Sequence, residues 1–490
     1  MRKNNFRWIA TCLLVAMLVN VIPIQADSSV PSKRDNSQKA GAADTVSGGA
    51  AEVTTPTPEA TATATVTPTA TPTVTPTVTP TAPPNLSIYK PAAPTVTARG
   101  GSAGVRVTWS KVTNASGYYI YARPSTDVSY QKIATVKDGS TVEYLHKSLT
   151  QNVTYYYRIA AYRTVSGTDV EGTLSAAVSA TTAAVSDTSK SAKKYSTKSA
   201  FQKSPAYKTY KKMKSAMKYS KSFAIPGMKN TNVAGFANTS MVPQGMCLAG
   251  SYFLITAYDY KKVDYSVVYV VSRSSKSYIT TIVLPSKAKV GGIAYDGTNV
   301  WISKGKAVAS FPYSVVTDAV NGGKAYTELS SYRSVISLES TASYMGYNNN
   351  VLWIGTFSQS TSSMKGYNVM NKSTVPSLVP AYTMDVPAKT QGITFDSEGT
   401  MILSRSYRTK KAKSGYISQL RTYKPSFSSP KSSGKVLKNA ALKITTMPPM
   451  VEGLAVYGTY TYALFSSSYY KSCKYPVDRV IAMKTNKLVE

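Results

Sequence analysis

The sequence Gln244-Gly245-Met246-Cys247-Leu248, followed after a turn by Tyr252-Phe253-Leu254-Ile255, shows the pattern that decides the fold of the C-terminal half. A small residue precedes an apolar run, a turn follows, and a second apolar run completes the unit. Four further copies share this order: Gly291–Ile302, Met345–Ile354, Gln391–Leu403 and Glu452–Phe465. Their glycines, at positions 245, 292, 346, 392 and 453, are separated by roughly the length of four short strands. Each copy therefore indicates one blade of a closed β-propeller.

The repeat region spans residues 241–490 and is rich in Val, Ile, Thr, Tyr and Ser. These residues, with few helix signals, favour strands. Asp296-Gly297 and Glu398-Gly399 are typical of hairpin turns between paired apolar runs. We therefore predict an all-β fold whose C-terminal domain is a five-bladed β-propeller. Six or seven blades would require divergent copies near residues 320 and 430.

The first residues have the pattern of a secretion signal. Met1–Arg7 is basic, Trp8–Ile24 is an apolar run, and Gln25-Ala26 offers a small residue before Asp27. The apolar run is short for a membrane span. We predict a signal peptide at residues 1–26 that is cleaved, with an uncleaved anchor as the alternative. The mature chain is then expected to have no transmembrane span and to be secreted, extracellular or cell-wall associated.

Two further segments have a biased composition. Residues 27–90 are small and polar and then almost wholly Thr, Pro, Ala and Val, which predicts a disordered region followed by a Thr/Pro-rich stalk. Residues 183–240 form a basic linker rich in lysine and serine. Within it, apolar residues recur at helix-like spacing: Tyr207, Tyr210, Met213 and Met217. Either they form an amphipathic helix on an anionic surface, or the linker is solvated and its aromatic residues pack lightly on the next domain.

The chain is strongly basic. It has 57 lysines and arginines against 23 acidic residues, a formal net charge of +34. An exported protein with this charge is attracted to anionic polymers without specificity. We expect an anionic polysaccharide or cell-wall polymer as the partner, with a surface protein as a second candidate and no specific nucleic acid. The alternative is a solvated surface charge with no dedicated partner.

Residues 91–182 show short alternating apolar runs separated by turns, which favour a small β-sandwich. Trp109 matches a buried tryptophan of the second strand, and Leu149 six residues before Tyr155 matches a tyrosine-corner strand. By these residues the segment resembles the fibronectin type III family, an immunoglobulin-like sandwich. The resemblance implies a spacer or weak adhesion unit and no chemistry. His146, the only histidine of the chain, is expected to be an ordinary residue at the sandwich edge.

The repeat region also resembles bacterial secreted β-propellers of a poorly characterised group. The motifs that carry this likeness are Gln391–Phe395 with Ser404–Tyr407, and Met447–Gly453 with Pro476–Arg479 downstream. The resemblance implies the fold and no known reaction. In such relatives Glu-Ser often follows the phenylalanine of the last apolar strand. This chain has Phe465-Ser466-Ser467 instead, so one carboxylate is absent.

In a propeller, the start of each innermost strand opens onto one mouth of the central channel, so the residue before each repeat glycine should point there. These residues are Gln244, Gly291, Met345, Gln391 and Glu452. Amides, tyrosines and arginines supply the directional hydrogen bonds and flat faces that a sugar or carboxylate ligand needs. The predicted ligand-binding cluster is Gln244, Gln391, Arg405, Tyr407, Glu452 and Arg479. The alternative is a structural plug in which an arginine pairs with the glutamate.

The repeat region offers few groups for catalysis. A glycosidase needs two carboxylates, and only Glu452 is placed at the mouth, because Asp296 and Asp396 look like turn formers. Ser-His-Asp chemistry is excluded because residues 241–490 contain no histidine. No cluster has zinc-ligand spacing and no glycine-rich loop opens a helix. We therefore predict no catalytic residue, no metal and no cofactor.

The resulting prediction is an exported binding protein whose propeller recognises an anionic polymer or glycan. One alternative is a polysaccharide lyase or hydrolase that uses Glu452, Arg405 and Tyr407. Another is an adhesin that binds protein through exposed aromatic residues, for which Tyr469 and Tyr470 are candidates.

Two cysteines remain once the signal is removed. Cys247 lies in the first repeat and Cys473 just after the last. Since first and last blades are neighbours in a closed ring, a disulfide between them is geometrically reasonable. Two thiols are equally compatible with the sequence.

Overall fold

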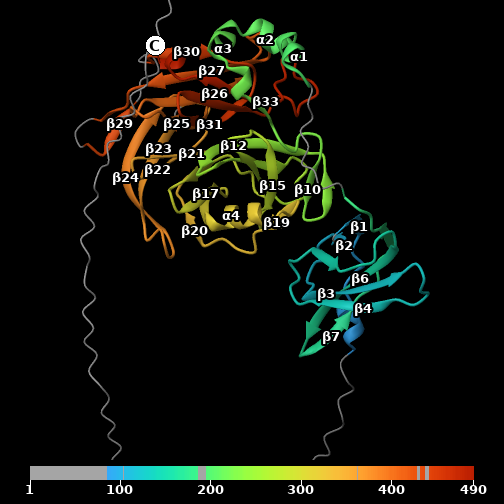
Figure 1. Cartoon of the computed structure of the whole chain (residues 1–490). Helices are drawn as coiled ribbons and strands as arrows, with labels where there is room; N and C mark the ends of the chain where they lie inside the picture. Colours follow the sequence, from blue (N-terminus) through green and yellow to red (C-terminus); the bar gives the residue numbers. More distant parts are fainter. Residues whose placement is uncertain are drawn as a thin grey trace, which may run out of the picture. The chain divides into compact units, whose positions relative to one another are not determined.

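The computed structural model describes residues 85–102, 104–185, 195–360, 362–427, 431–435 and 441–489. This part is all-β apart from short helices (Figure 1). The predicted signal peptide, and the disordered region and stalk up to residue 84, lie outside these residues. No helix within them is long and apolar enough to cross a membrane.

The first folded region is a sandwich of two sheets. One sheet has the order β1-β2-β5 and the other β4-β3-β6-β7, with β8 also paired to β6. The bounds are Val96–Gly101 (β1), Gly104–Trp109 (β2), Gly117–Pro124 (β3), Gln131–Val136 (β4), Glu143–Lys147 (β5), Thr154–Val165 (β6), Thr168–Glu171 (β7) and Val178–Thr181 (β8). A turn of 3₁₀ helix, η1 (Leu86–Tyr89), precedes them in the range predicted as stalk.

The sandwich core contains the residues that the sequence singled out. Trp109 is buried beside Tyr118, with ring centroids 5.2 Å apart. The Tyr155 hydroxyl accepts a hydrogen bond from the Thr150 backbone N–H at 3.3 Å, which is tyrosine-corner geometry. His146 Nδ1 lies 3.0 Å from the Tyr157 hydroxyl, and burial lowers the pKa of this histidine. The histidine therefore belongs to the packing of the sandwich.

In the described residues, five larger sheets follow, and β10 (Thr231–Val233) and β11 (Phe236–Asn238) form a separate two-stranded sheet. Each of the five larger sheets is an up-and-down arrangement of antiparallel strands, and the five orders are β12-β13-β14-β15, β16-β17-β18-β20, β21-β22-β23-β24, β25-β26-β27-β30 and β31-β32-β33-β9. The first three sheets have the bounds Met241–Ala249 (β12), Tyr252–Asp259 (β13), Val267–Ser272 (β14), Tyr278–Val283 (β15), Ile293–Tyr295 (β16), Asn299–Ser303 (β17), Ala307–Pro312 (β18), Ser334–Ser337 (β20), Tyr344–Asn348 (β21), Val351–Gly355 (β22), Ser362–Met370 (β23) and Ser377–Val386 (β24). The last two have the bounds Thr390–Phe395 (β25), Met401–Arg408 (β26), Tyr416–Tyr423 (β27), Lys443–Thr446 (β30), Val451–Tyr457 (β31), Tyr460–Phe465 (β32), Arg479–Lys484 (β33) and Phe223–Ala224 (β9).

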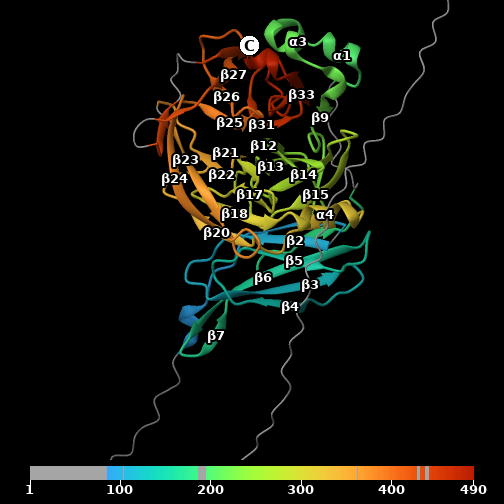
Figure 2. The same cartoon turned by 60° about the vertical axis from the view of Figure 1, so that its left-hand side comes forward.

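The first strands of these sheets contact one another in a closed order. β12 lies next to β16, β16 next to β21, β21 next to β25, β25 next to β31, and β31 next to β12. Figures 1 and 2 label four of these strands, β12, β21, β25 and β31, close to one another. We call this arrangement, formed by the five sheets listed above, the five-sheet ring. Each first strand begins a copy of the sequence repeat, so the repeat corresponds to one sheet.

The last sheet of the ring is completed by a strand from much earlier in the chain. β9 pairs with β33, aligning Phe223 with Val480 and Ala224 with Arg479. Three helices before it, α1 (Lys198–Gln202), α2 (Pro205–Thr209) and α3 (Lys211–Ala216), bury Phe201 and Met213 in a cluster with residues of β32 and β33. The range 183–240, expected to be a linker, therefore includes elements that pack on the last sheet. The expected domain boundary at 241 separates β9 from the sheet to which it belongs.

The segments where extra blades were considered are insertions. The chain near residue 320 forms α4 (Ser314–Asn321), and β19 (Tyr326–Glu328) joins the edge of the first sheet. Near residue 430, β28 (Ser426–Phe427) and β29 (Ser433–Lys435) extend the third sheet. In the described ranges neither segment adds a sheet to the ring. The remaining elements are η2 (Tyr219–Lys221) and α5 (Asn486–Val489).

Candidate site at the mouth of the five-sheet ring

The residues at the starts of the first strands surround a cavity of about 410 Å³, which we call the mouth pocket. Its lining includes one residue from the start of each first strand or the segment just before it: Gln244, Gly291, Ser343, Gln391 and Glu452. Lys289 and Phe357 also line it. The mouth pocket therefore collects residues that lie more than two hundred positions apart in the sequence.

Four of the five residues expected at the mouth line this pocket, and Met345 does not. Met345 instead lines a deeper cavity, together with Met246, Ile293, Ile393 and Leu454. The third repeat was therefore aligned two residues too late in the sequence. In it, Tyr344 takes the place of the repeat glycine and Ser343 occupies the mouth position.

Glu452 is the carboxylic acid of the mouth pocket. Its Oε1 accepts a hydrogen bond of 2.7 Å from the Ser466 hydroxyl. Burial raises the pKa of Glu452 to about 7, and this hydrogen bond and the nearby Lys289 ammonium act in the opposite direction. Within the described residues, no ion pair reaches Glu452. The carboxyl group is thus held in place without a counter-ion, and it changes protonation near neutral pH.

The two glutamines are oriented by the backbone. The Gln244 side-chain amide donates to its neighbouring Pro243 carbonyl at 2.9 Å, and the Gln391 amide donates to the Ser406 carbonyl at 3.2 Å. Fixed amides lose little entropy when a ligand binds. Both are therefore suited to directional hydrogen bonding in the pocket.

A second cavity of about 260 Å³, the side pocket, adjoins the first and shares Phe357, Gln391 and Glu452 with it. Its other lining residues include Ser406, Tyr407, Arg408, Tyr416, Ser466 and Tyr470. Burial raises the pKa values of Tyr416 and Tyr470, so both hydroxyls stay protonated and can donate. Glu452 therefore stands between an amide-lined cavity and a tyrosine-lined one.

Arg405 contacts Tyr407, which lines the side pocket, but Arg405 itself is not among the residues that line either pocket. Its Nε donates to the Ala388 carbonyl at 2.8 Å, and its guanidinium lies 4.6 Å from the centroid of the Tyr407 ring. The Lys389 ammonium lies 4.1 Å from the same centroid. Arg405 is therefore a positioning residue for Tyr407, and the structure does not pair it with Glu452.

Arg479 was expected at the mouth, and the structure places it elsewhere. It is buried on β33, where its Nη1 donates to the Tyr219 hydroxyl and its Nη2 to the Tyr195 carbonyl, both at 2.6 Å. Its Nε donates to Asp478 at 3.0 Å. The strand order explains the difference, because β33 is the third strand of its sheet and lies away from the central channel. Arg479 attaches the segment that precedes β9.

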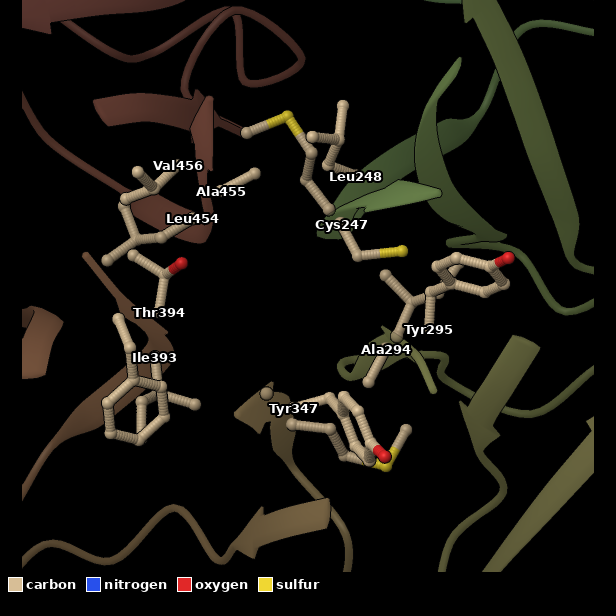
Figure 3. A pocket seen from close by; sticks show the side chains of 15 residues that line it. Cys247, Leu248, Ala294, Tyr295, Tyr347, Ile393, Thr394, Leu454, Ala455 and Val456 are labelled. Carbon is tan, nitrogen blue, oxygen red and sulfur yellow. The ribbon is translucent and has the colours of Figure 1, made fainter. Parts of the chain in front are cut away.

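The deeper cavity, which we call the channel pocket, lies along the first strands beyond the mouth. It has a volume of about 210 Å³ and is lined by three consecutive residues from each first strand (Figure 3). Most of them are apolar, such as Leu248, Ala294, Leu454 and Val456. Polar side chains therefore line much of the mouth pocket, whereas the side chains that line the channel pocket are mostly apolar.

The two cysteines are not joined by a disulfide. Cys247 is buried on β12, lines the channel pocket, and burial raises the pKa of its thiol. Cys473 lies after β32 in a turn where its N–H bonds to the Tyr470 carbonyl at 3.0 Å. The ring does bring the first and last sheets together, but Cys247 faces the channel and Cys473 lies on a loop.

Tyr469 and Tyr470 were considered as an exposed aromatic patch. Their ring centroids are 5.0 Å apart, and Tyr260 lies 5.8 Å from Tyr469. Of the three, only Tyr260 is largely exposed, at 56%. Tyr470 belongs to the side pocket, so the adhesin alternative would rest on Tyr260 and Tyr469.

Sequence reasoning missed several residues of the site. Lys289, Phe357 and Tyr416 lie on segments between repeats or on outer strands, where no repeat signal marks them. Ser466 did carry a signal, because the resemblance to secreted β-propellers implies a glutamate at this position. The structure shows that this serine bonds to the carboxyl of Glu452. Asp296 and Asp396 act as the expected turn formers, each accepting backbone N–H bonds of its own hairpin.

No family model and no curated protein matches the chain. Solved structures do match it. A β-1,2-glucanase from Parabacteroides distasonis is 22% identical over 20% of this chain and 13% of its own, with a TM-score of 0.18. A Fn3-like protein from Clostridium thermocellum is 22% identical over 20% of this chain and 97% of its own, with a TM-score of 0.16. Hydrazine synthase from Kuenenia stuttgartiensis is 9% identical over 47% of this chain and 58% of its own, with a TM-score of 0.27.

Several of the matched structures are fibronectin type III domains, and each match covers about a fifth of this chain. The chain spans only 13% of the length of the glucanase.

Proposed function

We propose that the five-sheet ring is a five-bladed β-propeller and that its mouth binds a glycan or polymer carrying acidic groups. The closed order of first-strand contacts supports the architecture. The observation that carries the function is the convergence of two oriented amides, one carboxyl and three tyrosines on adjoining cavities. Sugars need directional hydrogen bonds together with flat faces for packing.

Positive charge favours an acidic ligand over a neutral one. Lys289 lines the mouth pocket, Arg408 lines the side pocket, and Lys389 lies against Tyr407. Among the described residues that line either pocket, Glu452 is the only acidic one. The chain as a whole carries +34, which raises the local concentration of polyanions. On these grounds the protein binds an anionic polysaccharide or cell-wall polymer. It does so outside the cell, which is where the predicted signal peptide would direct it.

The test is calorimetric binding of trigalacturonic acid to the full-length chain, with neutral maltotriose as the comparison. Two variants probe the mouth: Lys289→Met, and Gln391→Leu, which removes the amide shared by both pockets at similar size. Lys324→Met, an exposed lysine of the ring, removes the same charge away from the mouth. We expect each mouth variant to weaken binding about ten-fold and the control to leave it unchanged. Equal binding by all variants would refute the site.

A second candidate is a polysaccharide lyase that acts in the same pockets. The observation that favours it is the pKa of Glu452, raised to about 7 by burial, because a general base or acid works best when its pKa is near the working pH. Lys289 would neutralise the uronate carboxylate while the neighbouring proton is removed. Formation of an unsaturated product from polygalacturonate, lost in Glu452→Gln, would establish turnover. Binding without product would leave the pockets as a recognition site.

A further inference from the structure

The sandwich presents an outer sheet face built from tyrosines and cations. On β3 the burial alternates, so Tyr118 and Ile120 point into the core while Tyr119, Tyr121 and Arg123 point outward. The register places Tyr121 opposite Arg158 and Arg123 opposite Tyr156 on β6. We call Tyr119, Tyr121, Arg123, Lys132, Tyr156 and Arg158 the tyrosine–cation face.

The cations of this face lie against aromatic rings. The Arg123 guanidinium lies 4.2 Å from the Tyr156 ring centroid, and the Lys132 ammonium lies 4.2 Å from that of Tyr119. Arg123 and Arg158 also flank the Tyr130 ring, at 5.3 and 5.4 Å. Such contacts hold the cations in defined places at little entropic cost on binding.

The three cations of this face outnumber the two acids at its edge, and none of them forms an ion pair with those acids. Asp169 and Glu171 lie at its β7 edge, but they accept hydrogen bonds from the Tyr119 and Tyr121 hydroxyls at 2.9 and 2.7 Å. Burial and these carboxylates raise the pKa values of both tyrosines to about 12, so their hydroxyls stay neutral. Among the described residues no ion pair involves Arg123, Lys132 or Arg158. The Nε atoms of Arg123 and Arg158 are buried and have no hydrogen-bond partner, and Arg123 Nη1 donates to the Pro124 and Asp127 carbonyls. A ligand would therefore contact the outer nitrogens of the two guanidinium groups.

We propose that the tyrosine–cation face binds an acidic polysaccharide chain, with sugar rings packed on the tyrosines and acidic groups on Arg123, Lys132 and Arg158. Charge complementarity selects a polyanion, and the aromatic rings select one made of sugar units over a simple ion. Neighbouring strands are spaced about 4.8 Å apart, close to the length of a sugar unit, so consecutive units can meet consecutive strands. This site is independent of the one proposed at the mouth.

The test measures binding of polygalacturonate, dextran sulfate and neutral dextran to the full-length chain at physiological salt. The first variant is Arg123→Thr/Arg158→Thr, since threonine suits a strand. Its matched control is Lys111→Thr/Lys147→Thr, which removes two exposed charges elsewhere on the sandwich. Tyr121→Thr tests ring packing, and Lys132→Gln is an exposed substitution that spares the fold. Circular dichroism establishes that each variant is folded.

We expect both the arginine and the Tyr121 variants to weaken polygalacturonate binding about ten-fold, and Lys132→Gln to weaken it several-fold. The lysine control should leave polygalacturonate binding unchanged. The loss caused by the two arginine substitutions should be the same in the Gln391→Leu background as in the parent, because the two sites are independent. A preference for dextran sulfate would identify a sulfated chain as the source of the acidic groups. An equal loss in the lysine control would overturn the proposal, because net charge alone would then act. Oligodeoxythymidylate is measured as a further ligand, and tighter binding of it than of polygalacturonate or dextran sulfate would also overturn the proposal.

Discussion

At the scale of single residues, the repeat glycines are explained by the narrowness of the ring. A Cβ atom on Gly453 would lie 2.4 Å from the Met246 backbone nitrogen, and one on Gly245 would lie 2.9 Å from the Gly291 carbonyl oxygen. First strands of neighbouring sheets therefore meet backbone to backbone at these positions. In the third sheet, Tyr344 occupies the position of the repeat glycine. Its ring lies over Gly355 on the next strand, where a residue with a Cβ atom would clash with it.

This packing predicts different costs for two glycines that look alike in the sequence. Gly453→Ala should destabilise the protein by about 3 kcal/mol or more, because the new methyl group meets fixed backbone. Gly346→Ala should cost less, since the nearest atom, at 3.0 Å, is a side-chain methyl group of Ile393 that can shift. Urea denaturation of both variants measures the difference. Equal losses would contradict the alignment of the third repeat given above.

Glu452 predicts a pH dependence of stability. Its pKa in the folded state is about 7, above its ordinary value of 4.5, so the folded protein binds more protons than the unfolded chain between these limits. The contribution of Glu452 to the free energy of unfolding is therefore fully present below about pH 4.5 and is lost as the pH rises through 7. Glu452→Gln should be more stable than the parent at pH 8, by up to about 3 kcal/mol.

Urea unfolding of the parent and the Glu452→Gln variant at pH 5, 6 and 8 measures this effect. Glu339→Gln is the control, because Glu339 is exposed and its pKa is lowered by the hydrogen bond from Lys365. Stability differences between parent and Glu452→Gln that do not change between pH 5 and 8 would contradict the assignment.

At the scale of elements, the segment around β9 closes the ring. The last sheet of the ring receives its outer strand from residues that precede the first sheet, so first and last parts of the domain are joined by strand pairing. Arg479 and Asp478 strengthen this junction: Asp478 accepts a hydrogen bond from the Tyr195 backbone N–H at 2.9 Å, and Arg479 bonds to the Tyr195 carbonyl. A residue predicted to bind ligand therefore serves ring closure.

Removing the Arg479 guanidinium should open this junction. Arg479→Met leaves the buried Asp478 without its cation and should cost about 3 kcal/mol or more. The loss should be accompanied by faster proteolysis between residues 195 and 224. Asp478→Asn/Arg479→Met should recover part of the stability, since no unpaired charge remains. Lys221→Met, which removes an exposed positive charge from the same segment, is the control and should leave stability unchanged. A thermal melt unchanged in Arg479→Met would show that β9 pairing alone closes the ring.

At the scale of the whole molecule, the proposed binding should have two separable contributions, one from net charge and one from the proposed sites. A chain with a formal charge of +34 attracts any polyanion, and this attraction falls steeply with salt. Binding in the two pockets is proposed to depend on oriented amides and tyrosines, so its affinity should decrease less as the salt concentration rises. Retention of the full-length chain on dextran sulfate should therefore decrease with salt to the same degree in the parent and in Gln391→Leu.

Trigalacturonic acid measures the other contribution. Its binding should persist at physiological salt in the parent and be weakened in Gln391→Leu. If both ligands lost binding in parallel as salt increases, net charge would account for all of the interaction.

The sequence determined the local elements. Period-two apolar runs and turn residues such as Asp296-Gly297 mark strands and hairpins because each depends only on neighbouring residues. The recurrence of one unit in sequence also indicated that one sheet would follow another. The same local signals placed Gln244, Gln391 and Glu452 at the starts of first strands, where they line the mouth pocket.

Only the tertiary structure decided the rest. The place of Arg479, the pairing of β9 with β33, and the contact of Ser466 with Glu452 depend on segments far apart in the chain. Local periodicity carries no information on which distant segments will meet, because the ring closes through strand pairing and packing between parts far apart in the chain. The alignment of the third repeat failed for the same reason. A tyrosine over a cross-strand glycine satisfies the ring as well as a glycine does, and only the packed sheet shows that the two are equivalent.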